Sequence, residues 1–481
     1  MKKELGHSFW GIIDTAVYPV IYMAVVPLLM DNLGTDGFGF WIILNTLMVI
    51  FQLFNLNIGV TAMKELAGQA ADIANKRLNA LFSIMFALFV LVSLVGLLCG
   101  ILEENFNFSG LSSAPVRSVF ECIVLAACIA GLRFLDQLYH GALKAKELIK
   151  VSALLKIFNK VGLLGITVYL AIEGFDITVL LYGNVIFSLV NLLLLIVVIK
   201  RYYKGYQPSF SKDTRMIRGL FKFSMWPWLQ SLFVVIAFQT DRFWVSSYAG
   251  LDEVANYGLM ATIFNHIHII YTTMFIWVLP RVSAMAYKAI DPFPFYEKIR
   301  EFFSVFVLFS LLFFYFISPY IIPLWIGHEH YENMKSYLQL FVVFELLFSC
   351  TIMPFLYMNA TGKERQITYL TALFCFLSYA FMLIALLTTH SVEWMIGGMA
   401  ISMALSMPIL NYFVQKSSAK YKFKTNHIVK EMSPIYSAVG LVILPEPWSL
   451  LFLIPIAYYL FRSISTFYQL KKDGETFNFS K

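Results

Sequence analysis

Apolar stretches long enough to cross a lipid bilayer recur along this sequence, and they constrain its fold more than any other feature. A transmembrane helix needs roughly twenty predominantly apolar residues. The 481 residues are 59% hydrophobic and 14% charged, with a mean hydropathy of +0.72, whereas a typical soluble domain is about 25% charged. These values exclude a soluble globular protein and predict an all-α integral membrane protein.

The apolar stretches predict about fourteen transmembrane helices, arranged as two sets of six and a final pair. The first set is expected at 9–31, 39–62, 79–101, 118–140, 153–173 and 177–199. The second set is expected at 220–247, 254–280, 299–319, 338–359, 367–387 and 394–415. The pair is expected at 433–445 and 448–467, and its first member is short for a complete crossing.

These spans predict four parts of the chain. An N-terminal six-helix bundle is expected at 1–199 and a basic cytoplasmic linker at 200–219. A C-terminal six-helix bundle is expected at 220–415. A basic loop, the helix pair and a cytoplasmic tail then fill 416–481.

Basic residues gather on one side of the predicted membrane. With the N-terminus in the cytoplasm, 31 of the 36 lysines and arginines fall in inner loops and ends, and only Arg117 and Lys335 fall in outer loops. Such an excess of positive charge marks the cytoplasmic side. We therefore expect both termini in the cytoplasm. The net charge of +7 is explained in the same way, and no nucleic-acid partner is expected.

The two sets of helices carry signs of an internal repeat. LGTDGFGFWIIL at 33–44 aligns with AGLDEVANYGLM at 249–260 at a constant offset of 216, so that Gly34 meets Gly250 and Trp41 meets Tyr257. A weaker match aligns LYHGALK at 138–144 with LYMNATG at 356–362. Because each repeat holds an even number of spans, the halves are expected to be parallel and related by an axis along the membrane normal.

Ionisable side chains inside the predicted spans are the candidates for a functional site, because such residues are costly in a bilayer and usually face a partner or a cavity. Arg133 and Asp136 are three residues apart, so they share a helix face and can pair. Asp241 and Arg242 are adjacent and point about 100° apart. Each of these two is expected to find its partner on another helix; for Arg242 the choice lies between Glu345 and a cavity that receives substrate. All these charges could instead be structural pairs that lock helices together.

No enzyme motif is found. The sequence contains no GxSxG, HExxH, P-loop or GxGxxG, and it has no ATPase domain. Any transport would therefore be driven by an ion gradient, by the substrate gradient or by a partner. The five cysteines all lie in predicted spans and are interpreted as small apolar side chains. No metal or other cofactor is expected.

Several motifs resemble those of a known family. QTDRFWVSSYAGLDEVANYGLMATI at 239–263 is similar to a pattern of the polysaccharide and O-antigen (lipid-linked oligosaccharide) flippases, in which an Asp with a basic neighbour precedes an apolar run, a Gly and a Tyr. NLGTDGFGFWIILNTL at 32–47, FNLNIGVTAMKELA at 54–67 and FLYMNATGKERQ at 355–366 resemble other turns of the same family. The family belongs to the multidrug/oligosaccharidyl-lipid/polysaccharide exporter superfamily.

The resemblance implies two six-helix bundles around a central cavity in a bacterial inner membrane. It implies a flippase that moves an undecaprenyl-diphosphate-linked oligosaccharide from the inner to the outer leaflet by alternating access. Besides this substrate and membrane lipids, it implies the polysaccharide polymerase and glycosyltransferase machinery as partners. It also implies a cationic lumen, and here the sequence departs from the family. More than three residues from their ends, the twelve spans of the two sets hold three basic residues, Arg133, Lys160 and Arg242, and four acidic ones.

The candidate site residues follow from this reading. Arg133 and Arg242 are expected to bind diphosphate or acidic sugars, because Arg forms bidentate bonds to such anions. Asp136 and Asp241 would orient these groups or carry protons, and Tyr139 and Trp244 would stack on sugar rings. The candidates for ion coupling are Asp14 and Glu345. Two other classes stay open: an ion-coupled multidrug and toxin extrusion antiporter with Asp14 as its cation or proton site, and a membrane scaffold that transports nothing.

Overall fold

The computed structural model describes residues 2–55, 58–107, 111, 114–211, 228–417 and 435–443, and every regular element in these ranges is a helix. The chain divides into two compact units, Met1–Leu259 and Met260–Lys481, with the boundary inside one helix. Nine helical segments of the described ranges are long and apolar enough to cross a membrane. An all-α membrane protein is thereby confirmed. The finer count of about fourteen spans stays a prediction.

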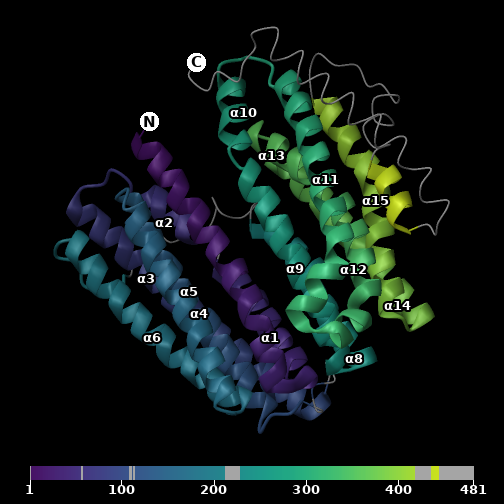
Figure 1. Ribbon diagram of the computed structural model, residues 1–481. Helices are drawn as coiled ribbons and strands as arrows, with labels where there is room; N and C mark the ends of the chain where they lie inside the picture. The colour runs from purple at the N-terminus through teal and green to yellow at the C-terminus, as the bar shows by residue number, and fades with distance from the viewer. Residues whose placement is uncertain are drawn as a thin grey trace. The chain divides into compact units, whose positions relative to one another are not determined.

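The first unit is built around α4 (Val119–Ala145). Its other helices are α1 (Lys2–Gln52), α2 (Ile58–Leu66), α3 (Ala71–Phe106), α5 (Ile149–Ile172), α6 (Ile177–Tyr202), α8 (Asp241–Ala249) and the start of α9 (Leu251–Phe275). Helix α4 packs against α1, α2, α3, α5 and α6 (Figure 1). Small residues permit this close packing: a methyl group at Gly96 of α3 would lie only 2.2 Å from Cβ of Ala127.

The second unit is built around α12 (His328–Ser349) and α13 (Ile352–Ala360). Around them lie the rest of α9, α10 (Val278–Tyr287), α11 (Phe293–Ile326), α14 (Glu364–Thr389) and α15 (Val392–Ser417). Helix α12 packs against α11 and α15, and α13 packs against α10 and α14. Thus α4 and the α12–α13 pair, which correspond to the fourth predicted span of each set, are both enclosed by neighbouring helices.

Two glycines end the first helix of each predicted repeat in the same backbone conformation. Helix α1 is broken at Gly34, where φ is 69° and ψ is 171°. Gly250 separates α8 from α9 with φ 93° and ψ 176°. This region of backbone space is essentially restricted to glycine. The sequence alignment of Gly34 with Gly250 is therefore matched by a shared local structure.

Several helices extend beyond the predicted spans. Helix α3 runs from Ala71 to Phe106 around the span 79–101, and α11 runs from Phe293 to Ile326 around 299–319, because apolar content marks the bilayer core and not the ends of a helix. The predicted span 39–62 is divided, since α1 ends at Gln52 and α2 begins at Ile58. Of the final pair, residues 435–443 are helical, and 448–467 lies outside the described residues.

Residues 209–211, in the middle of the predicted linker at 200–219, lie along α3. The backbone N–H of Ser209 donates to Asn79 Oδ1 at 3.0 Å, and that of Ser211 donates to Ser83 Oγ at 2.7 Å. Between them, the Phe210 ring lies 5.2 Å from the Phe86 ring. These contacts hold the segment against the first unit, whereas residues 212–219 lie outside the described part of the chain.

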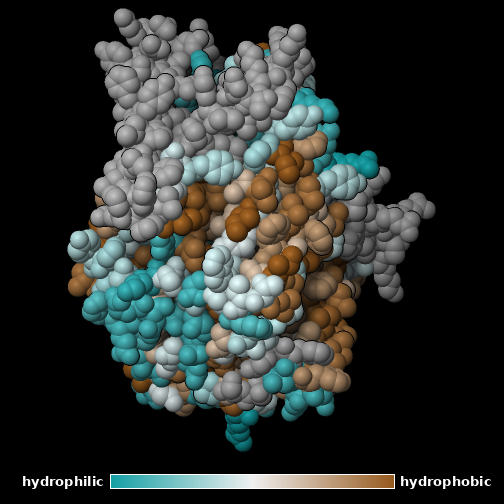
Figure 2. All heavy atoms as spheres, turned by 90° about the vertical axis from the view of Figure 1, so that its right-hand side faces the viewer, coloured by the Kyte–Doolittle hydropathy of each residue, from teal (hydrophilic) through white to brown (hydrophobic). Residues whose placement is uncertain are grey.

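Apolar side chains cover much of the described surface on the side that carries α14 and α15 (Figure 2). Phe376 and Ile384 of α14 and Leu405 of α15 are among the exposed ones. A soluble monomer rarely exposes a large contiguous apolar patch, and a bilayer is the solvent that such a surface requires.

Candidate functional site

The adjacent charges of α8 turn to different helices, as the sequence predicted. The Asp241 carboxylate accepts a short hydrogen bond from the Tyr257 hydroxyl of α9 through Oδ2. The Arg242 side chain reaches α1, where its Nη1 donates to Thr46 Oγ1 at 3.0 Å. The same Nη1 makes a short hydrogen bond to Gln239 Oε1. Asp241 therefore joins the two arms of the Gly250 turn, while Arg242 joins this turn to α1.

Arg242 is a buried cation held by neutral acceptors. Its exposed fraction is only 6%, and its buried Nε has no hydrogen-bond partner among the residues that the structure describes. Within the described residues, no carboxylate forms an ion pair with its guanidinium. The nearest acid in the sequence, Asp241, accepts instead from the backbone N–H of Arg242 at 3.0 Å and from Tyr257. The positive charge thus retains hydrogen-bonding capacity for an anion.

A second polar group lies on α4. Asp136 Oδ1 accepts a hydrogen bond from Asn191 Nδ2 of α6 at 2.7 Å, and Asp136 Oδ2 lies 3.5 Å from Nε2 of His140 one turn further along. Arg133 is half-buried one turn before Asp136, and the pairing of these two stays a prediction. One position later, Gln137 accepts from Asn55 Nδ2 at 2.5 Å. This face of α4 is therefore polar and is held by groups from other helices.

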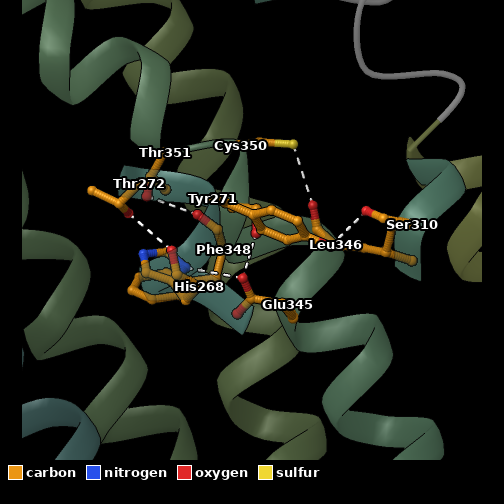
Figure 3. A network of polar contacts seen from close by, with 10 residues as sticks. His268, Tyr271, Thr272, Ser310, Glu345, Leu346, Phe348, Cys350 and Thr351 are labelled. Atoms are coloured by element: carbon orange, nitrogen blue, oxygen red, sulfur yellow. Dashed lines mark hydrogen bonds and ion pairs between the residues drawn. The ribbon is translucent and has the colours of Figure 1, made fainter. Parts of the chain in front are cut away.

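A third polar group lies in the second unit, around Glu345 (Figure 3). Glu345 Oε1 lies 3.0 Å from His268 Nδ1 and accepts a short hydrogen bond from Ser349. The His268 ring stacks on Phe348, with centroids 4.3 Å apart. One turn along α9, the Tyr271 hydroxyl lies 2.6 Å from Ser310 Oγ. Because Glu345 is only 2% exposed, its environment is set almost wholly by these side chains.

The remaining predicted site residues occupy different settings. Tyr139 is fully buried, with its hydroxyl 3.4 Å from that of Tyr206. Stacking of Tyr139 on a sugar would require this ring to be uncovered, so that role stays a prediction. Trp244 is half-buried on α8. Asp14 belongs to α1, but its side chain lies outside the described part of the structure.

Sequence reasoning missed most of the partners of these charges. Thr46, Asn191 and His268 lie far along the chain from Arg242, Asp136 and Glu345, respectively, and no local motif joins them. Tyr257 was singled out through its alignment with Trp41 in the repeat and as the Tyr of the family pattern, but not as a partner of Asp241. In the described ranges, no group of three or more His, Cys, Asp or Glu side chains is placed to hold a metal ion.

Solved transporters share this fold. An inward-facing multidrug resistance transporter of the MATE family, within the MOP superfamily, aligns with a TM-score of 0.61 at 14% identity, covering 84% of this chain and 96% of that one. A MOP superfamily transporter from Pyrococcus furiosus aligns with a TM-score of 0.57 at 14% identity, covering 86% of this chain and 95% of that one. The fold is therefore that of a multi-pass membrane protein, shared with these two transporters.

The family follows from the sequence match. The family described as "Polysaccharide biosynthesis protein" matches residues 9–286, more than half of the chain, and this chain belongs to it. The solved structures that share its fold are transporters. A relative from Shigella flexneri, named "Putative O-antigen transporter", is 23% identical over 284 residues. That match spans 58% of this chain and 66% of the relative, just under two thirds of its length.

Proposed function

We propose that this protein is a flippase for an undecaprenyl-diphosphate-linked oligosaccharide, such as an O-antigen or another polysaccharide repeat unit. It moves this substrate from the inner to the outer leaflet of a bacterial cytoplasmic membrane by alternating access. About fourteen helices form two six-helix bundles, at 1–199 and 220–415, with a linker at 200–219 and a C-terminal helix pair within 416–481. Membership of the polysaccharide biosynthesis family and the name of the Shigella relative support this proposal.

The observation that carries the proposal is the chemistry of Arg242. A charged side chain at the centre of a membrane helix costs about 2.5–3.5 kcal/mol on insertion scales. Arg242 is buried and bonds to the neutral Thr46 and Gln239. A transporter of diphosphate-linked substrates needs such a cation, because guanidinium binds phosphate oxygens in a bidentate manner.

The other polar groups take supporting roles in this proposal. Arg133 is the second cation for the diphosphate or an acidic sugar, and Asp136 and Asp241 orient these groups or carry protons. Trp244 and Tyr139 contact sugar rings. Asp14 and Glu345 couple the cycle to an ion gradient, and the His268–Glu345 contact gives Glu345 a neighbour that can share a proton.

Deletion of the gene tests the proposal. Surface glycan should be lost, and lipid-linked precursor should accumulate on the inner leaflet. If the protein were an ion-coupled multidrug antiporter, its deletion would instead leave the surface glycan unchanged and make the cells more sensitive to cationic dyes. Normal surface glycan in the deletion strain, together with loss of dye efflux in Asp14→Asn, would contradict the flippase proposal and support the antiporter.

A further inference from the structure

The outer turns of the two predicted repeats touch each other at equivalent positions. A methyl group at Gly39 of α1 would lie 1.9 Å from the carbonyl oxygen of Leu251, and 3.3 Å from the backbone nitrogen of Ala255. A methyl group at Gly258 of α9 would lie 2.7 Å from Cγ2 of Ile42. At the offset of 216, Gly39 corresponds to Ala255 and Ile42 to Gly258. The contact is therefore close to symmetric, as expected where two repeats meet on their shared axis.

Arg242 supplies a polar bond beside this contact. On α1, Thr46 lies one turn beyond Ile42 and donates its hydroxyl hydrogen to the Ile42 carbonyl at 2.9 Å. Its oxygen remains free to accept from Arg242 Nη1 at 3.0 Å. On the other side, the Asp241–Tyr257 bond stiffens the α8–α9 turn. The turn can therefore move as one piece, and Arg242–Thr46 is a side-chain bond that its separation from α1 must break.

We propose that the Arg242–Thr46 bond is a latch that the anionic group of the substrate releases. The inference rests on the proposed function, since it needs an anion that enters from the inner side. A phosphate or carboxylate oxygen is a stronger acceptor for guanidinium than the Thr46 hydroxyl, because hydrogen bonds between two charged groups are the strong ones. When the anion binds Arg242, the Arg242–Thr46 hydrogen bond between α8 and α1 is lost. Binding of the substrate therefore favours separation of the two outer turns.

A disulfide can report directly on the state in which α1 and α9 are in contact, which we call the closed state. An ideal Cβ at Gly258 lies 3.7 Å from Cβ of Ile42, within the range of about 3.5–4.5 Å found in disulfides. Replacing Ile42 by Cys also removes the Cγ2 atom that a side chain at 258 would strike. The I42C/G258C variant should therefore cross-link under mild oxidation and lose glycan export, and reduction should restore export. I42C and G258C alone are the matched controls, in a background without the native cysteines.

The latch is tested by the rate of this cross-link. Thr46→Val keeps the shape of the side chain and removes the acceptor, whereas Thr46→Ser keeps the hydroxyl. In the I42C/G258C background, T46V should slow cross-linking by roughly tenfold, the effect of losing one charge-assisted hydrogen bond, and T46S should match the parent. Cells that make the lipid-linked oligosaccharide should cross-link more slowly than cells that lack its first glycosyltransferase.

Three results would overturn the latch. The first is an equal cross-linking rate for T46V, T46S and the parent, and the second is an equal cross-linking rate with and without substrate. The third is undiminished glycan export by fully cross-linked protein. If the double variant does not reach the membrane, thiol labelling of I42C alone replaces it. Ile42 is 3% exposed, so T46V should accelerate labelling and T46S should not. Normal surface glycan in the deletion strain would defeat the proposed function separately, because the effect of T46V on cross-linking does not depend on which cargo is carried.

Discussion

Glu345 and His268 meet at 3.0 Å between α12 and α9, and Ser349 donates a second hydrogen bond to the same carboxylate oxygen. The imidazole ring is fixed from one face by Phe348. A buried acid with an imidazole neighbour can exchange a proton without leaving an isolated charge behind. This geometry makes Glu345 the better defined of the two ion-coupling candidates.

The first prediction concerns Glu345. Glu345→Ala should destabilise the folded protein by about 1–3 kcal/mol, because His268 and Ser349 lose a buried acceptor. Glu345→Gln keeps an acceptor oxygen and should retain most of the stability, while its glycan export should no longer respond to collapse of the proton gradient. Thermal unfolding in detergent and export with an uncoupler measure the two effects. Wild-type behaviour of Glu345→Gln in both assays would remove Glu345 from ion coupling.

The second prediction concerns Arg242. Because its side-chain acceptors are the neutral Thr46 and Gln239, Arg242→Ala leaves no carboxylate unpaired and should leave the protein level in the membrane close to that of the wild type. Export should nevertheless stop, since the cation for the anionic group is gone. Arg242→Lys should restore export in part, because Lys keeps the charge and loses the bidentate fork.

Membrane protein level and surface glycan, measured together, decide the Arg242 prediction. A large loss of protein in Arg242→Ala would assign the residue a structural role. Normal export at a normal protein level would exclude it from the substrate site.

The third prediction concerns the turn at Gly250. Gly250→Ala should cost about 1–3 kcal/mol, because φ is +93° there and a side chain would also crowd Asp252 at 3.1 Å. Gly165→Ala in α5 is the matched control: it meets nothing within 4 Å, and Ala is favoured over Gly inside a helix by about 1 kcal/mol. Thermal unfolding of the two variants should therefore shift in opposite directions. Equal shifts would show that the Gly250 conformation is not required.

The sequence was sufficient to predict features that depend on local pattern. Apolar length revealed the membrane helices, and the alignment of Gly34 with Gly250 predicted corresponding turns in two repeats, which the structure shows to share one backbone conformation. Adjacency alone showed that Asp241 and Arg242 must seek different helices, because successive residues on a helix point about 100° apart. Each of these inferences needs only the geometry of a single helix or turn.

The partners themselves could not be predicted, because they depend on how helices pack. In the sequence, Thr46 is one polar residue in an apolar stretch, and only its contact with Arg242 in the structure marks it. No local pattern marks His268, whose neighbour Glu345 lies 77 positions away. Tyr139 looked suited to sugar stacking, yet its ring is covered in this conformation and faces Tyr206. Predicting such contacts requires the helix–helix interfaces and not the helices alone.

The fourth prediction is topological. Single cysteines at Asp252 and Glu332 should react with a membrane-impermeant thiol reagent added outside the cell. Cysteines at Ser211 and Lys422 should react only after the membrane is opened, because basic loops stay in the cytoplasm. Labelling of the Lys422 site from outside would contradict the predicted orientation of the C-terminal region.

The fifth prediction is movement of the substrate across a membrane that contains only this protein. Lipid-linked oligosaccharide extracted from the deletion strain is labelled on its sugar and reconstituted with the purified protein into vesicles, in which an impermeant quencher reports the outer leaflet. Wild-type vesicles under an ion gradient should move labelled lipid between leaflets many times faster than protein-free vesicles, and Arg242→Ala vesicles should match the protein-free rate. Equal rates in wild-type and protein-free vesicles would contradict the account.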